Sequence, residues 1–125
     1  MSNSPLAIGI DFGGTSVKFG VVDGAEVIES ADRLVTRDYP DPPRLIDAMA
    51  DTTRALREKH PTVAAVGIGM PGFVDFARGF VHNLSNVPGW QDVPMRDEFA
   101  KRCDLPCQVE NDANEIGRAS CRGRR

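Results

Sequence analysis

The sequence of 125 residues predicts a single α/β domain with a mixed β-sheet. Three observations support this prediction. Short apolar runs followed by glycine or proline turns are typical of strands. Residues 43–60 repeat apolar side chains at helical spacing. The run Val63–Gly69 is continuously apolar, as in a strand buried on both faces of a parallel sheet.

The first third of the chain predicts an antiparallel meander of three strands. Residues 6–11 form a short apolar run that ends in an acid. Phe12-Gly13-Gly14-Thr15 predicts a tight turn, because paired glycines permit positive φ. Val17–Val22 predicts a returning strand, and Asp23-Gly24 after it is a strong hairpin signal. Residues 26–36 supply the third strand.

A helix is predicted over residues 43–60. Asp41 is a candidate N-cap, prolines suit the first turn, and Pro61 ends the helix. One face of this helix is apolar and is expected to pack on the sheet: Leu45, Ile46, Met49, Ala50, Thr53 and Leu56.

The remaining elements complete the order β-β-β-α-β-α-β-α, in which strand-helix-strand links are expected to be right-handed. They are a strand at 63–69, a small hairpin at 73–81, a loop at 82–90, a short helix at 94–102, a strand at 107–110 and a helix that begins at 111–114.

Composition excludes several classes of protein. Residues 1–114 hold 11 Lys and Arg against 17 Asp and Glu, a net charge of −6, and residues 115–125 carry +3. The acidic body has no basic stripe, so nucleic-acid binding is not expected. No apolar run reaches the roughly 18–20 residues that span a bilayer, and the N-terminus lacks a secretory signal. We therefore expect a cytoplasmic protein with no membrane contact.

Asp11-Phe12-Gly13-Gly14-Thr15 is the first candidate site. A turn with two glycines lets backbone N–H groups converge on an anion, and the Thr15 hydroxyl adds a donor. Asp11 at the strand end can hold a magnesium ion through water, carried in by a phosphate. The alternative is a plain β-turn with a solvated aspartate, and the residues alone leave both open.

Three further segments carry residues suited to ligand binding. Gly72 follows a buried strand, where α/β sheets place ligands, although a simple proline-glycine turn also explains it. Asn86 lies in an amide-rich loop suited to sugar hydroxyls, and Trp90 either packs on a sugar face or anchors that loop to the core. Asp112 can accept a proton from an attacking hydroxyl and Asn111 can orient the same sugar, or either residue can cap a helix.

Three cysteines predict neither a disulfide framework nor a zinc site. Cys103 and Cys107 have no matching second pair and no histidine nearby, so two small semi-buried residues are expected.

Four segments in order, IGIDFGGTSVKFGVVD, GIGMPGFVD, NLSNVPGW and VENDAN, resemble the ROK family of repressors, open reading frames and sugar kinases. The resemblance covers roughly residues 6–114. It implies the N-terminal half of the actin-like, ribonuclease-H-like kinase fold. It also implies a hexose kinase that transfers the γ-phosphoryl group of ATP, or of polyphosphate, to the sugar 6-hydroxyl.

The resemblance assigns a role to each candidate residue. Asp11 acts at the magnesium site, and Gly13, Gly14 and Thr15 cradle the ATP phosphates. Gly72 and Asn86 line the sugar pocket, Asn111 holds sugar hydroxyls, and Asp112 binds the sugar and is the catalytic base. The PGW loop leans toward glucose; N-acetylhexosamine is another candidate. The parent protein is expected to form a homo-oligomer.

The chain departs from the family pattern at both ends. We expect it to begin at the first strand, without the helix-turn-helix of the family's repressors, and to end before the second domain and its zinc segment. Residues 115–125 resemble the translation of a sequencing adapter, so we expect residues 1–114 to be the natural domain and the Arg-rich tail to be an artefact. The fragment alone is expected to be inactive. A sugar-sensing regulator and a non-catalytic sugar-binding module are the alternatives.

Overall fold

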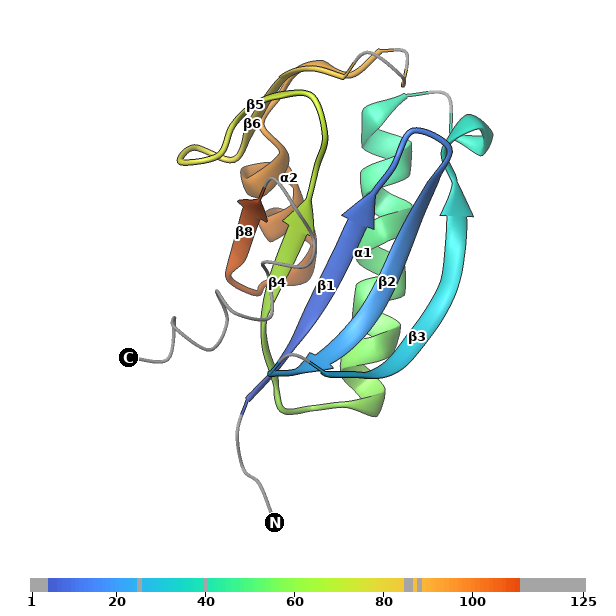
Figure 1. Ribbon diagram of the computed structural model, residues 1–125, viewed down its shortest axis with the longest axis vertical. Helices are drawn as coiled ribbons and strands as arrows, with labels where there is room; N and C mark the ends of the chain where they lie inside the picture. Colours follow the sequence, from blue (N-terminus) through green and yellow to red (C-terminus); the bar gives the residue numbers. More distant parts are fainter. Residues whose placement is uncertain (1–4, 25, 40, 85–86, 88, 111–125) are drawn as a thin grey trace.

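The computed structural model describes residues 5–24, 26–39, 41–84, 87 and 89–110. Two sheets and two helices make up this part of the chain (Figure 1). The elements are β1 (Leu6–Phe12), β2 (Ser16–Asp23), β3 (Glu26–Val35), the 3-10 helix η1 (Thr36–Asp38), α1 (Pro42–Lys59), β4 (Val63–Gly69), β5 (Phe73–Asp75), β6 (Phe80–Asn83), β7 (Gln91–Val93), α2 (Met95–Cys103) and β8 (Cys107–Glu110).

The larger sheet is mixed, as the sequence predicts. Its five strands have the order β3-β2-β1-β4-β8. The meander β1–β2–β3 is antiparallel, whereas β4 pairs parallel to β1 and β8 pairs parallel to β4. Both helices lie behind this sheet in the view of Figure 1. The arrangement confirms the expected meander followed by β-α-β units.

The second sheet is larger than the predicted hairpin. Residues 82–90 were expected to form a loop, but His82 and Asn83 belong to β6, and the short strand β7 pairs with β6. The sheet order is β5-β6-β7. The sequence does not predict the strand β7, because this strand has only three residues and contains Asp92 at a φ of +54°. Pairing with β6, and not strand propensity, explains its conformation.

The core fills the space between the large sheet and the two helices. Alternate residues of the central strand β1, Ile8, Ile10 and Phe12, are fully covered. The predicted apolar face of α1 is buried at all six positions, which confirms the helical pattern. The Asp41 carboxylate accepts a hydrogen bond from the Arg44 amide at 3.0 Å, so the predicted N-cap is also confirmed.

An ion-pair network joins α1 to α2. The Arg102 Nε atom lies 2.5 Å from Asp47 Oδ1 on α1, and Arg102 Nη1 lies 3.0 Å from Glu98 Oε1 one turn earlier on α2. The hydrogen bond from Arg102 lowers the pKa of the Glu98 carboxyl below its ordinary value. The bond to Asp47 in turn raises the pKa of the Arg102 guanidinium. Both shifts stabilise the charged forms of the network.

The lowered pKa of Glu98 predicts a pH-dependent stability. Its contribution to the free energy of unfolding is complete above the ordinary carboxyl pKa and is lost as the pH falls through the folded-state value. We expect the melting temperature to fall less in Glu98→Gln than in the original chain between about pH 6 and about pH 3. Glu58→Gln, which alters an exposed acid on α1, is the control and should leave the pH profile unchanged. Identical profiles for Glu98→Gln and the original chain would contradict the assignment.

Candidate functional site

Three parallel strands end at one edge of the large sheet. Asp11 of β1 is in register with Gly69 of β4, which is in register with Glu110 of β8. The Met70 amide donates to the Glu110 carbonyl at 2.9 Å and ties the last two ends together. Neighbouring strands lie about 4.8 Å apart, so Asp11 and Glu110 are separated by roughly 10 Å across this edge. We call this edge, at the top of Figure 1, the strand-end edge.

The turn from β1 to β2 lies at the strand-end edge. The Gly13 amide donates to the Ser16 carbonyl at 2.8 Å. A Cβ atom on Gly13 would lie only 3.1 Å from that same oxygen, so a larger residue would have to displace it by a few tenths of an ångström. The predicted tight turn is confirmed, although neither Gly13 nor Gly14 is among the described glycines with positive φ, which are Gly24, Gly72, Gly79 and Gly89. Close approach to Ser16 is the reason for glycine at position 13.

Thr36, which sequence reasoning missed, holds this turn from the side of the third strand. Its hydroxyl donates to the Gly14 carbonyl at 3.0 Å, and its amide donates to the Thr15 carbonyl at 3.1 Å. The third strand was expected to include this residue, but β3 ends at Val35 and Thr36 begins η1. The β2–β3 register that pairs Ser16 with Val35 brings residue 36 to the turn, but this register contains two shifts that the sequence does not signal.

Gly72 brings the segment after β4 against the end of β6. Its φ is +95°, and a Cβ atom there would lie 2.9 Å from both the Asn83 carbonyl oxygen and Leu84 Cδ2. Only glycine can adopt this positive φ and also fit against these two atoms without strain. Gly72 therefore lets the segment that follows β4 approach the end of β6 closely.

Trp90 anchors the 84–90 segment to the core. Its side chain is 1% exposed, and its ring meets that of Phe12 edge-on with centroids 4.8 Å apart. The Trp90 carbonyl also accepts a hydrogen bond from the Leu84 amide at 3.1 Å. The core-anchoring alternative is thus confirmed. Because Phe12 precedes Gly13, the same contact supports the β1–β2 turn.

Three of the predicted site residues, Asn86, Asn111 and Asp112, lie outside the described residues. The structure brings the others to the strand-end edge: Asp11, Gly13, Gly14, Thr15 and Gly72. Glu110, the residue before Asn111, ends β8 at this edge.

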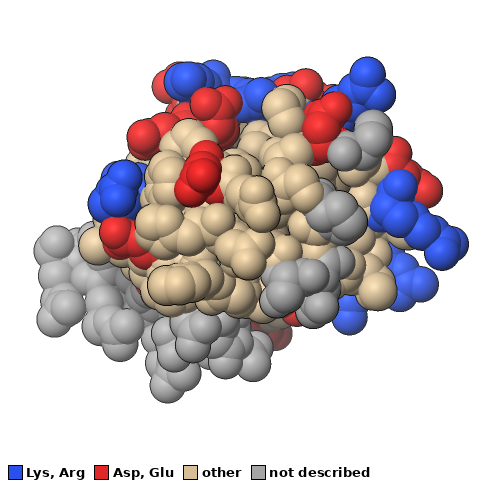
Figure 2. All heavy atoms as spheres, turned by 90° about the horizontal axis from the view of Figure 1, so that it is seen from above, with Lys and Arg blue, Asp and Glu red and all other residues tan. Residues whose placement is uncertain are grey.

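The face that contains the strand-end edge is seen in Figure 2, which views the molecule from the top of Figure 1. Uncharged residues occupy its centre, carboxylates are scattered among them, and Lys and Arg gather at the rim. Asp11 is exposed and has Lys18 of β2, also exposed, as its cross-strand partner. An exposed carboxylate beside a glycine turn suits a Mg²⁺ ion that keeps most of its waters and arrives with phosphate oxygens.

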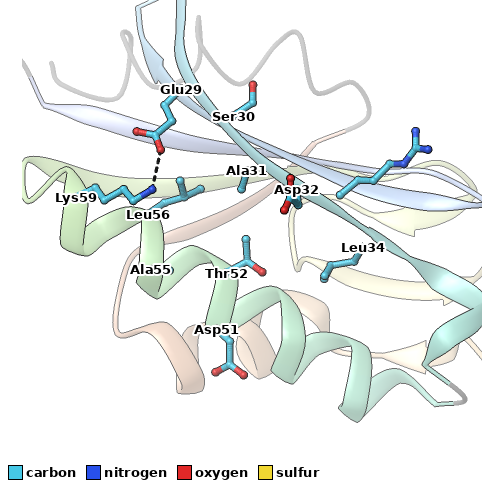
Figure 3. A pocket seen from close by; sticks show the side chains of 11 residues that line it. Glu29, Ser30, Ala31, Asp32, Leu34, Asp51, Thr52, Ala55, Leu56 and Lys59 are labelled. Atoms are coloured by element: carbon cyan, nitrogen blue, oxygen red, sulfur yellow. Dashed lines mark hydrogen bonds and ion pairs between the residues drawn. The ribbon is translucent and has the colours of Figure 1, made fainter.

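A hollow of about 550 Å³ lies between β3 and α1 and is lined by none of the predicted site residues (Figure 3). At one end of it Glu29 binds Lys59 and His60 at the end of α1, with oxygen–nitrogen distances of 3.2 and 2.6 Å. Hydrogen bonds from His60 and Lys59 lower the pKa of Glu29. These contacts join β3 to α1 and have no part in the strand-end edge.

The two described cysteines are free thiols in apolar surroundings. Burial raises the pKa of Cys103 to about 11. Burial, together with the neighbouring Cys103, raises the pKa of Cys107 to about 12. Within the described ranges no three His, Cys, Asp or Glu side chains gather as a metal site would require. Neither described helix combines the length and the apolar character that a membrane span requires.

Comparison with known proteins identifies the family. The ROK family sequence model matches residues 7–120, so the chain belongs to the ROK family. It is 38% identical over 109 residues to a glucokinase of Streptomyces coelicolor, covering 87% of this chain and 33% of that protein. It is 31% identical over 107 residues to an N-acetyl-D-glucosamine kinase of Escherichia coli, covering 85% and 34%. The chain thus spans about a third of the length of these curated relatives.

Solved structures share the fold. A ROK family glucokinase from Streptomyces griseus, in complex with glucose and AMPPNP, superposes with a TM-score of 0.75 at 36% identity over 85% of this chain and 33% of that one. A polyphosphate/ATP-glucomannokinase from Arthrobacter gives 0.72 at 29% identity, over 87% and 45%. A ROK family transcriptional regulator gives 0.71 at 16% identity over 83% and 27%, which shows the fold alone. The chain therefore has the actin-like ATPase fold of the ROK sugar kinases.

Replacement of Gly72 by alanine tests the close approach at the strand-end edge. We expect Gly72→Ala to lower the free energy of unfolding by about 2 kcal/mol, because it adds a Cβ atom at positive φ against the Asn83 carbonyl. Gly9→Ala is the matched control, since a Cβ atom there meets Val22 Cγ2 at an ordinary 3.5 Å. Urea denaturation measures both. Equal stability of the two variants would show that Gly72 is not under this constraint.

The raised thiol pKa values predict slow alkylation. In a Cys121→Ser background at about pH 7.5, iodoacetamide should modify Cys103 and Cys107 about a hundredfold more slowly than a free cysteine, because the thiolate is scarce and covered. Mass spectrometry after timed quenching measures the rate, and the urea-unfolded chain is the positive control. Native and unfolded chains reacting alike would contradict the burial of these thiols.

Proposed function

We propose that this chain is the N-terminal, phosphate- and sugar-binding part of a glucokinase-like hexose kinase. In this proposal the γ-phosphoryl group of ATP passes to the 6-hydroxyl of a hexose. The observation that carries it is the common edge reached by β1, β4 and β8, which gathers Asp11, the Gly13–Thr15 turn and Gly72. Ligands of open α/β sheets bind at such strand ends. The Streptomyces griseus relative, whose structure contains glucose and AMPPNP, supports the two ligands.

The proposal gives each candidate residue a role. The backbone of the Gly13–Thr15 turn approaches the phosphates closely, because Gly13 and Gly14 carry no side chain to block that approach. Asp11 would hold Mg²⁺ through water, where the ion would supply positive charge beside the phosphate oxygens. Gly72 and Asn86 border the sugar, and Asn111 orients its hydroxyls. Asp112 accepts the proton of the 6-hydroxyl as that oxygen attacks phosphorus.

Three finer points belong to the same proposal. Glucose is the favoured sugar, since glucokinases are among the relatives at 38% and 36% identity. An N-acetylhexosamine is the next candidate, from the Escherichia coli relative. ATP is the favoured donor, and the Arthrobacter relative makes polyphosphate the alternative. We further propose that the whole protein acts in the cytoplasm as a homo-oligomer.

A sugar-sensing regulator is the second candidate, and its support is weaker. The similarity to a transcriptional regulator is structural only, at 16% identity. A regulator needs to bind sugar but needs neither a nucleotide site nor a catalytic base. Activity that depends on Asp112 therefore separates the two functions.

A chimera tests the proposed function. Residues 6–114 of this chain replace the matching segment of the Streptomyces coelicolor glucokinase, with which the chain is 38% identical over 109 residues. We expect ATP-dependent formation of glucose 6-phosphate, followed by coupled dehydrogenase assay. Asp112→Asn should lower kcat by about 10²- to 10⁴-fold through loss of the base. The chain of 125 residues alone should show no turnover, because in-line transfer requires both substrates to be held together.

Asp32→Asn is the control for this assay, because Asp32 is an exposed carboxylate on β3 remote from the strand-end edge. It should leave kcat unchanged. A folded chimera whose activity is equal with and without Asp112 would refute the kinase proposal. Glucose binding without turnover in the folded chimera would favour the regulator.

A further inference from the structure

The hydroxyl of Thr36 makes a long-range hydrogen bond of an unusual kind for a buried threonine. Thr36 and Thr53 are the buried polar residues of the described chain, 5% and 0% exposed. Thr53 donates within its own helix to the Met49 carbonyl at 2.9 Å, a local bond that helical threonines commonly make. Thr36 instead donates to the Gly14 carbonyl, 22 positions earlier in the chain. Its bond therefore joins η1 to the β1–β2 turn.

The two bonds from Thr36 fix the direction of the turn's peptide groups. A trans peptide is planar, so its C=O and N–H bonds point in opposite directions. The described chain has no cis peptide bond. Because the Gly14 carbonyl points at the Thr36 hydroxyl, the Thr15 N–H points away from Thr36. The second bond, from the Thr36 amide to the Thr15 carbonyl at 3.1 Å, fixes the next peptide in the same way.

We propose that Thr36 is a positioning residue for phosphate binding. It holds the β1–β2 turn so that the Thr15 N–H is directed at a phosphate oxygen of the nucleotide, while Thr36 itself stays buried and touches no ligand. A donor that is already aimed binds an oxyanion without the reorganisation that a free turn would require. This inference rests on the proposed function, since it takes the ligand of the turn to be a nucleotide.

Conservative variants of Thr36 distinguish the effect of its hydroxyl group from the effect of its side-chain volume. Thr36→Val keeps the shape and removes the donor, whereas Thr36→Ser keeps the donor. Thr53→Val is the matched control, because it removes a buried hydroxyl of α1 whose partner is local. Amide NMR spectra of the chain of 125 residues are recorded during titration with Mg²⁺·AMPPNP and, separately, with glucose. NMR is suited to the weak affinity expected of a partial site.

The expected result is a selective loss of nucleotide affinity. The original chain, Thr36→Ser and Thr53→Val should show the same Kd from the shifts of the Gly13, Gly14 and Thr15 amides. Thr36→Val should raise that Kd about tenfold and leave the glucose titration unchanged. Where Thr36→Val does not give a folded spectrum, Thr36→Cys, which keeps the volume with a weak donor, must show the same selective loss.

Two results overturn the inference, and they are distinguishable. Nucleotide binding by Thr36→Val, or by Thr36→Cys in its place, with the Kd of the original chain shows that the turn needs no support from Thr36, and it leaves the proposed function intact. An original chain in which Mg²⁺·AMPPNP shifts none of the turn amides refutes the nucleotide site itself, and Thr36 then has no ligand to serve. Equal losses of affinity for nucleotide and for glucose would show that the substitution destabilises the whole chain, and they would also refute a positioning role.

Discussion

The parallel pairing of β4 with both β1 and β8 is the constraint on which the rest of the structure depends. Parallel strands cannot be joined by a tight turn, so the chain must cross over through helices, and α1 and α2 are those crossovers. The crossovers cover the same face of the sheet, and their apolar faces bury alternate residues of β1 and β4. Parallel direction also brings the strands' carboxyl ends to one edge. The parallel pairing therefore explains both how the core is packed and why the candidate site residues lie at one edge.

The turn after β1 is supported from two chemically different sides. On one side Phe12, which precedes the turn, packs edge-on against Trp90 in the apolar core. On the other, Thr36 supplies two hydrogen bonds to the turn's carbonyls. An apolar contact fixes position but not the rotation of a peptide plane, whereas a hydrogen bond fixes both. The combination gives a defined orientation to a segment in which glycine would otherwise allow many conformations.

Periodicity predicted the elements whose stability comes from their own burial pattern. Each of these elements buries a continuous or periodic apolar set that is visible in the sequence. The structure confirms the strands at 6–11, 63–69 and 107–110 and the helix with its Asp41 cap. The strand β7 and the role of Thr36 were not predictable in this way, because both depend on partners far along the chain. The β2–β3 ladder contains two register shifts, so counting back from the Asp23-Gly24 turn does not place residue 36 beside residue 14. Gly13 and Gly14 do not use the positive φ that glycine permits, because bonds to Ser16 and Thr36 select the turn's conformation.

Under the proposed function, binding and catalysis make different demands on the strand-end edge. Backbone amides at a braced turn act through fixed direction, so their attraction for phosphate depends on groups that this chain itself contains. Phosphoryl transfer also requires the acceptor hydroxyl, the phosphorus and the leaving oxygen to lie in line with water excluded. The hollow between β3 and α1 lies away from this edge, and the chain spans about a third of the length of its curated relatives. Under the proposed function, the support that Thr36 gives to the turn should therefore appear first in nucleotide affinity. An effect on turnover requires the remaining parts of the protein to bring the sugar hydroxyl to the same phosphate.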